Sequence, residues 1–324
     1  MSSVNYCFSC PTQLPDEAAE VCPYCGFDRR SYTCREGWLR PELFANRYFV
    51  GRAVSSDRRG ASFVAYDAVM RRKVIIRQLL ASDDTENGAY RAYSRREEFE
   101  RTYRRLASLE LSSLPVVYTF QTSEQLSFAV TGYYSERTLR DLANENGAYA
   151  YAAAKELLQP VADSLRLIHE QRVFHGNVRM ESINAACLPD GSNRLVLCDF
   201  SGVVTDDDPH NVTEPGAKDV RDFLFVLLSL TQSAATEDNE EELSRTIGGL
   251  SASPDEKDYI ERVLIGGDKQ ASSAEELLKN IYGCSNISSG RIRQPAKPEA
   301  PEFIRSAADE AGVRIISSAA SVVG

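Results

Sequence analysis

The chain has 324 residues, of which 43% are hydrophobic and 26% are charged, and its formal net charge is -10 at pH 7. This composition is typical of a globular protein, and the length predicts two lobes or two domains. The negative charge repels phosphate backbones, so nucleic-acid binding is not expected. No apolar run approaches the roughly 18 residues that span a bilayer, and MSSVNYCFSC lacks the features of a signal peptide, which predicts a cytoplasmic protein without a membrane segment.

Four cysteines lie close to the N-terminus, in the sequences CFSC and CPYCG. They are Cys7, Cys10, Cys22 and Cys25. A two-residue spacer lets one turn aim two thiolates at a single ion, and the glycine after the second pair suits a tight turn. The segment between the pairs has few core-forming residues, so bound zinc, worth about 10–16 kcal/mol in such sites, is the expected source of its stability. The pattern predicts a zinc ribbon over residues 1–28.

Other interpretations of the cysteines are two disulfides or a redox pair. Disulfides belong to an oxidising compartment, for which no signal sequence argues, and a redox pair normally sits in a strand-helix context that neither motif has. Four thiolates would close the metal site, which makes the zinc structural rather than catalytic. Cys187, Cys198 and Cys284 are expected to be buried as small apolar residues.

The first half of the remaining chain is predicted to be rich in strands. A polar linker over residues 29–46 leads to three segments with strand-like alternation, RYFVGRAV, ASFVAYDAVM and RKVIIRQLL. The spacing of Phe99, Tyr103 and Leu106 predicts a helix within residues 94–110. Residues 116–134 then read as a hairpin.

The second half is predicted to be mostly helical. Residues 152–173 carry apolar side chains at three-to-four spacing, which indicates a helix with one buried stripe. A short buried strand is predicted in RLVLCDFSG and a largely apolar helix in DVRDFLFVLLSLT. Two terminal helices follow in PDEKDYIERVLIGG and SAEELLKNIYG. The acidic stretches TDDDP and TEDNEEE read as exposed loops, and residues 284–324 as a Pro-rich linker and tail.

The order of these elements resembles the bacterial serine/threonine protein kinase-like family, including members with an N-terminal zinc ribbon. The resemblance covers about residues 47–282 and rests on RYFVGRAV, VAYD, TLRDL, HGN, CDFSG and SAEELL. It implies an α+β chain with a two-lobed protein kinase-like fold behind the ribbon. The implied domain covers residues 47–283, with a strand-rich N-lobe over about 47–131 and a helical C-lobe over about 137–283.

The resemblance places the N-lobe groups that handle phosphate on altered residues. The three glycines of the phosphate loop fall on Ser55, Asp57 and Gly60, and Asp57 would turn a negative charge toward an anion. The lysine that holds the phosphates falls on Arg77, whose forked guanidinium is not an equivalent group. The glutamate that orients this lysine falls on Thr102, with Glu98 one turn earlier as the alternative.

The C-lobe groups are altered in the same way. The catalytic base falls on Asn177, whose neutral amide cannot accept a proton, and a magnesium ligand falls on Ser182. The other metal-binding aspartate is retained as Asp199. Scaffold positions of the family are also retained, namely His175, Phe200, Leu106 and Asp219.

The pocket for adenine is altered as well. The family's valine, alanine and leucine fall on Ser62, Ile75 and Asn184. Extra bulk in a snug site costs about 1–3 kcal/mol, so ATP and magnesium are not expected as cofactors.

These substitutions predict a catalytically inactive pseudokinase, not an enzyme, that acts as a protein-binding scaffold or regulatory module. The alternative is a kinase-like enzyme with atypical phosphoryl or nucleotidyl transfer, in which Asp199 holds a metal and Arg77 grips a nucleotide. The arginines between residues 91 and 105 would suit an acidic partner, or they belong to a solvated helix with neighbouring glutamates. A ribbon that binds nucleic acid is the least favoured, because no stacking aromatic series accompanies its arginines.

Overall fold

The computed structural model describes residues 6–10, 12–15, 20–57, 59–80, 88–200, 215–231, 240–265, 272–283 and 291–292. The chain divides into two compact units. Among the described residues, the first unit comprises 6–108 and 116–133, and the second comprises 109–115 and 134–292. Most of the predicted tail, and Cys284 with it, lies outside these residues. None of the described helices is both long enough and apolar enough to cross a membrane.

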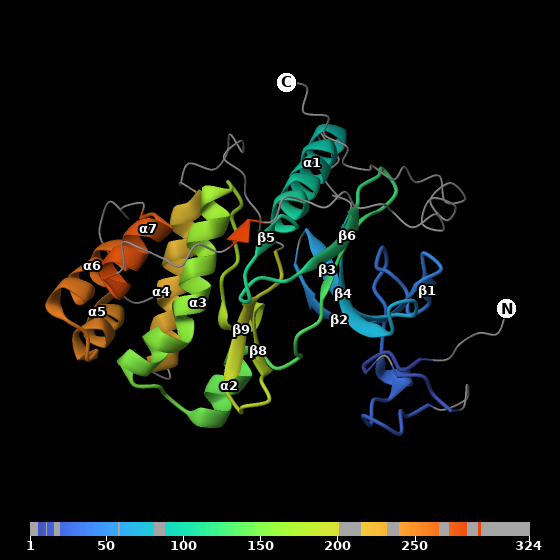
Figure 1. The fold of residues 1–324 in the computed structure, drawn as a ribbon, viewed down its shortest axis with the longest axis horizontal. Helices are drawn as coiled ribbons and strands as arrows, with labels where there is room; N and C mark the ends of the chain where they lie inside the picture. Colours follow the sequence, from blue (N-terminus) through green and yellow to red (C-terminus); the bar gives the residue numbers. More distant parts are fainter. Residues whose placement is uncertain are drawn as a thin grey trace. The chain divides into compact units, whose positions relative to one another are not determined.

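The first unit is built on a six-stranded antiparallel sheet in the order β1-β2-β3-β4-β7-β6 (Figure 1). Its strands are β1 (Leu43–Phe44), β2 (Tyr48–Ser56), β3 (Gly60–Asp67), β4 (Arg72–Leu79), β6 (Val117–Gln121) and β7 (Ser127–Gly132). The three predicted strands and the predicted hairpin are confirmed. The pairing of β2 with β3 shifts register on both sides of Ala53, which bends β2 before it enters the loop to β3.

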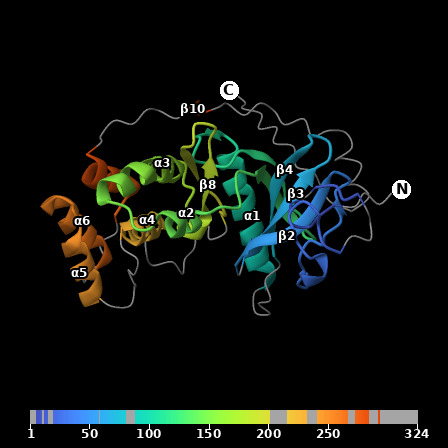
Figure 2. The same ribbon diagram turned by 90° about the horizontal axis from the view of Figure 1, so that it is seen from below.

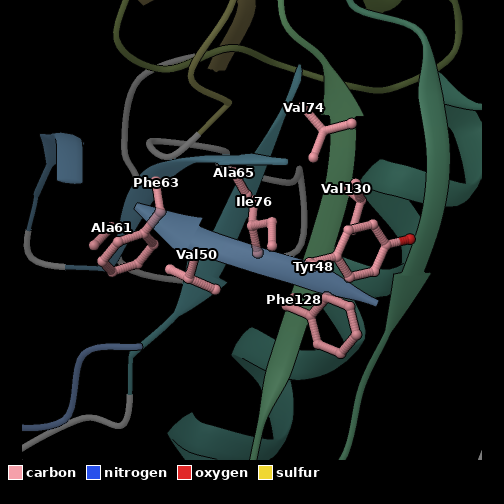
Figure 3. Close-up of a cluster of buried hydrophobic side chains, with 9 residues drawn as sticks. All are labelled: Tyr48, Val50, Ala61, Phe63, Ala65, Val74, Ile76, Phe128 and Val130. Atoms are coloured by element: carbon pink, nitrogen blue, oxygen red, sulfur yellow. The ribbon is translucent and has the colours of Figure 1, made fainter. Parts of the chain in front are cut away.

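One face of this sheet carries a cluster of nine buried side chains (Figure 3). They are Tyr48, Val50, Ala61, Phe63, Ala65, Val74, Ile76, Phe128 and Val130. The segment 37–46 packs on this face, where Trp38 meets Phe63 edge-on with ring centroids 5.7 Å apart. The buried amide of Gln78 donates to the Gly37 carbonyl at 2.8 Å and accepts from the Leu39 N–H at 2.9 Å. We call this side the strap face; because side chains alternate along a strand, Arg77 lies on the opposite face.

The predicted helix of the first unit is confirmed as α1 (Gly88–Leu106), which starts earlier than expected. Figure 2 shows it alongside the strands of the sheet. Its buried stripe is the predicted one, Phe99, Tyr103 and Leu106. On its outer side Glu100 pairs with Arg104, and the same carboxylate accepts from Thr122 at 3.0 Å. One arginine of the stretch between residues 91 and 105 is thus paired with a glutamate of the same helix.

The second unit contains the other α-helices of the described residues, with α3 lying beside α4 (Figure 1). The helices are α2 (Leu139–Asn146), α3 (Tyr151–Glu170), α4 (Pro215–Thr231), α5 (Glu240–Gly249), α6 (Pro254–Leu264) and α7 (Ala274–Leu277). The strands form two antiparallel pairs, β5 (Leu109–Glu110) with β10 (Arg291–Ile292) and β8 (Ile183–Cys187) with β9 (Asn193–Leu197). The predicted mixed α+β class is therefore confirmed.

Two expectations for the second unit are corrected. Residues 240–242 of the acidic run begin α5 rather than a loop, because three glutamates in a first turn suit the positive end of a helix. Cys187 is exposed rather than buried, since it ends β8 next to the turn that leads into β9.

Candidate functional site

The four N-terminal cysteines come together in the first unit. Their sulfur atoms all lie within 4.8 Å of one another, and the distances from Cys7 to Cys25 and from Cys10 to Cys22 are both 3.7 Å. A tetrahedral zinc with Zn–S bonds of about 2.3 Å requires sulfur–sulfur edges of about 3.8 Å. The cluster therefore fits a metal ion such as zinc, bound by four thiolates.

Two small backbone turns place these sulfur atoms. The N–H of Cys7 donates to the Thr12 carbonyl, and the N–H of Cys22 donates to the Phe27 carbonyl, each at 2.9 Å. Gly26 closes the second turn with φ of +72°, a conformation that favours glycine. The predicted role of this glycine is thus seen in the backbone.

The thiols differ in their acidity. Burial raises the pKa of Cys7 to about 12. Burial also acts to raise the pKa of Cys22, but N–H groups of Tyr24 and Cys25 directed at its sulfur lower it to about 7. Since metal ligands must be thiolates, metal binding would displace protons from this cluster, and its affinity would fall as the pH falls.

Arg77 and Asp57 form an ion pair on the opposite side of the sheet from the strap. Arg77 projects from β4, its side chain is only 4% exposed, and its Nη2 lies 3.1 and 3.0 Å from the two oxygens of Asp57. The Nη1 atom lies 3.4 Å from the Ser62 hydroxyl. The predicted phosphate-binding cation is therefore in contact with a carboxylate from the loop that was expected to receive the phosphates.

The loop between β2 and β3 is shaped for this pair. The N–H groups of Arg59 and Gly60 donate to Asp57 Oδ1 at 2.6 and 2.9 Å, which fixes the carboxylate. A Cβ on Gly60 would lie 2.3 Å from the Gln78 carbonyl and 2.8 Å from Arg77 Nη2. Gly60 is thus needed for the close approach of Arg77, a role that sequence reasoning did not assign to it.

The two residues expected at the position of the orienting glutamate differ in charge and in their contacts. Thr102 is buried in α1, with 2% exposure, and offers no charge. Glu98 is an acid on the same helix, and it pairs with Arg59 at 3.6 Å. Glu98 is therefore linked to the same β2–β3 loop that holds Arg77.

In the second unit the segment around His175 is held by the buried carboxylate of Asp219. The N–H groups of His175 and Gly176 donate to it at 2.7 and 2.6 Å, and His169 Nε2 lies 2.9 Å from it. Burial acts to raise the pKa of Asp219, but the hydrogen bond and charge of His169 and the other donors hold it below the usual range. This carboxylate serves as a structural anchor.

His175 is held in its neutral form. Its Nε2 donates to the Cys198 carbonyl at 2.7 Å, and its Nδ1 accepts from the Asn177 N–H at 3.3 Å. Burial lowers the pKa of His175, although the charges of Asp219 and Asp199 act to raise it. The ring also packs edge-on against Phe200 with centroids 4.7 Å apart, so two of the retained scaffold residues do touch.

The residues expected at the catalytic positions lie around this segment. The Ser182 hydroxyl is buried and donates to the Arg179 carbonyl at 2.9 Å while accepting from the Arg179 N–H at 3.0 Å. Asp199 has φ of +63° and a side chain that is 10% exposed, and Arg179 Nη2 lies 4.0 Å from it. Arg179 is a cation that sequence reasoning missed, although its place between Asn177 and Ser182 could have drawn attention to it.

Asn184, which the resemblance places at the adenine pocket, forms hydrogen bonds with neighbouring backbone in the second unit. The side-chain amide of Asn184 donates to the Ser135 carbonyl at 2.6 Å, and Asn184 forms an isolated bridge with Thr138. An asparagine at this position therefore ties β8 to the start of α2. The other two positions, Ser62 and Ile75, are buried and half-buried on β3 and β4.

Comparison with known proteins shows similarity to bacterial serine/threonine-protein kinases. A probable serine/threonine-protein kinase of Corynebacterium efficiens is 27% identical over 147 residues, which cover 44% of this chain and 21% of that protein. Serine/threonine-protein kinase C of Synechocystis sp. is 25% identical over 166 residues, covering 49% and 29%. The probable serine/threonine-protein kinase PknB of Corynebacterium glutamicum is 26% identical over 150 residues, covering 44% and 22%. No family model matches.

The matched region is less than half of this chain and less than a third of each relative. The names of the relatives nevertheless correct one prediction. The chain was predicted not to be an enzyme, whereas the relatives are named as kinases, which are enzymes. That prediction is wrong. It rested on substituted residues alone, and the loss of individual catalytic groups lowers the reaction rate while the rest of the site stays in place.

Proposed function

We propose that the chain is a kinase-related regulatory module that acts by binding a protein partner and is stabilised by zinc at Cys7, Cys10, Cys22 and Cys25. The similarity to serine/threonine-protein kinases supports the kinase-related part. Two exposed apolar side chains on the cysteine-bearing segment, Val21 at 48% and Tyr24 at 64%, support a role in protein contact.

One observation carries the regulatory part, the ion pair of Arg77 with Asp57. The cation that would grip nucleotide phosphates already has a carboxylate partner, from the β2–β3 loop, at 3.0 Å. A nucleotide would have to displace Asp57, which also loses two backbone donors if it moves. Because a small ligand must supply that cost from its own contacts, ATP is expected to bind weakly to the chain as it stands.

A thermal-shift titration with ATP and magnesium or manganese tests this proposal. The midpoint of unfolding is expected to move by less than about 1 °C, because a ligand stabilises only in proportion to its occupancy. A shift of several degrees that disappears in Asp199→Ala would overturn it. The immobilised full chain is expected to capture a protein partner. The Tyr24→Ala variant should no longer capture it, whereas the control variant Asp258→Asn, at a solvent-exposed aspartate, should still do so.

The second candidate is phosphoryl or nucleotidyl transfer at Asp199 and Arg77. Asp199 favours it, because this carboxylate is retained in a left-handed backbone conformation with the Arg179 cation 4.0 Å away. The names of the relatives also favour use of ATP and magnesium. Transfer of labelled phosphate or nucleotide from ATP that requires both Asp199 and Arg77 would select this candidate over the first.

A further inference from the structure

The segment from Tyr6 to Phe27, which we call the cysteine segment, packs on the face of the sheet that carries Arg77. The ring of Tyr6, next to Cys7, stacks on Phe49 with centroids 4.0 Å apart and lies 5.5 Å from Tyr66. Phe49 and Tyr66 are cross-strand partners, so their side chains share one face. Alternation along β3 places Ser62 and Val64 on that face too.

The cysteine segment also forms hydrogen bonds with β2 at the position where the pairing of β2 with β3 is irregular. The Phe8 carbonyl accepts from the Arg52 N–H at 2.5 Å, and Arg52 Nε donates to the Ser9 hydroxyl at 3.1 Å. Just after this segment in the chain, the Tyr32 hydroxyl accepts from the Ala53 N–H at 3.3 Å. These contacts fall where the pairing of β2 with β3 changes register, so the cysteine segment supplies partners at that bulge.

Gly51 makes the contact possible. A Cβ at this position would lie 2.3 Å from the Phe8 carbonyl oxygen, 2.9 Å from the Val64 carbonyl oxygen and 3.0 Å from Val64 Cγ1, so a larger residue would press on both the cysteine segment and β3. Val64 is the cross-strand partner of Ile75, and the next pair on the same face is Ser62 with Arg77. The cysteine segment therefore covers the row of the sheet beside Arg77.

We propose that the segment from Tyr6 to Phe27 is a metal-dependent clasp on β2. The clasping residues Tyr6, Phe8 and Ser9 flank Cys7, so a metal held by the four sulfurs fixes their positions on Phe49, Gly51 and Arg52. When the metal leaves, the clasp releases the bulge of β2, which runs directly into the loop that holds Asp57 against Arg77. The inference rests on the proposed metal site and does not depend on the proposed protein partner.

Hydrogen exchange of the full chain tests the clasp with zinc as the probe. Removal of zinc with a chelator is expected to raise amide exchange about tenfold over residues 52–57, and added zinc is expected to restore protection. Tyr6→Ala should give the same rise while the chain still binds one zinc, since loss of a stacked, half-buried ring is worth about that factor. The matched control Tyr24→Ala changes an exposed ring of the same segment and should leave exchange in β2 unchanged.

A second pair of variants guards against a local effect of Tyr6. Gly51→Ala should detach the clasp with zinc still bound, so that exchange in β2 no longer changes when zinc is removed; Gly248→Ala, which has open space around it, should keep that change. Zinc binding with unchanged exchange of β2 after chelation would overturn the clasp alone. Absence of zinc binding by the wild-type chain would overturn the metal site and the clasp together, and capture of a protein partner would remain a separate result.

Discussion

Two aspartates that each gather several donors, Asp57 in the first unit and Asp219 in the second, differ in their access to water. Asp57 of the first unit accepts from two backbone N–H groups and from Arg77, and its side chain is 27% exposed. Asp219 of the second unit accepts from His175, Gly176 and His169 with no exposure. The exposed part of Asp57 is open to an ion or ligand, whereas Asp219 cannot exchange its partners without local unfolding. Exchange with ions or ligands is therefore expected at Asp57 rather than at Asp219.

Replacement of one cysteine ligand should give the largest difference in stability between the two units. Cys22→Ser is expected to abolish zinc binding and unfold the cysteine segment, because bound zinc supplies about 10–16 kcal/mol in such sites and the apolar cluster of the segment is small. Hydrogen exchange should rise across residues 7–28 and leave the amides of α3 protected. Cys187→Ser, at an exposed cysteine of the second unit, is the control and should retain zinc. Equal loss of protection in both units would contradict independent roles.

Asp219→Asn addresses the second unit. The amide cannot accept from all the donors that surround the carboxylate, so the free energy of unfolding is expected to fall by about 3 kcal/mol. Urea denaturation followed by circular dichroism measures the change. Asp258→Asn replaces an exposed aspartate of α6 and should alter the stability by less than about 0.5 kcal/mol. A loss of similar size in both variants would show that Asp219 is no anchor.

A double-mutant cycle on Asp57 and Arg77 sharpens the contrast. Asp57→Ala alone is expected to destabilise by about 2 kcal/mol, because it removes the acceptor of two N–H groups and leaves a buried guanidinium. Arg77→Met and the double variant complete the cycle, with an expected coupling energy of about 1 kcal/mol. The coupling should fall only in part in 1 M salt, because Asp57 is partly exposed to the screening ions whereas Arg77 is buried. A coupling that salt does not change would place this pair with the buried one.

The sequence was informative where the determinants are local. Alternation predicted β2, β3 and β4, and the apolar stripe predicted α3. The helix α2 was missed, although Thr138 and Asp141 form a capping box that its sequence spacing could have indicated. The hairpin partner β8 was missed because its short, mixed sequence carries no clear alternation.

The same distinction between local and long-range determinants holds for the candidate site. The spacing of the cysteines was enough to bring four sulfurs together, because each pair is set by one turn. The pairing of Arg77 with Asp57 was not predicted, since it joins residues that only the register of a folded hairpin brings close. The sequence suggested that Asp57 would repel an anion; the structure adds that it binds the neighbouring cation.

The smallest expected effect is a pH dependence that arises from His175. Burial keeps its folded-state pKa below the unfolded value of about 6.5, so between the two values the unfolded chain binds a proton that the folded chain does not. The stabilising contribution is present above about pH 6.5 and is lost as the pH falls toward the folded-state pKa, by about 1 kcal/mol between pH 7.5 and 5.5. Urea denaturation at the two pH values measures the loss, and His175→Gln, which cannot titrate, should show a smaller one. Imidazole ¹⁵N NMR of the folded wild type should report a proton on Nε2 throughout; a second proton on Nδ1 at pH 5.5 would show that Asp219 and Asp199 outweigh burial, and that this unit also responds to its solution conditions.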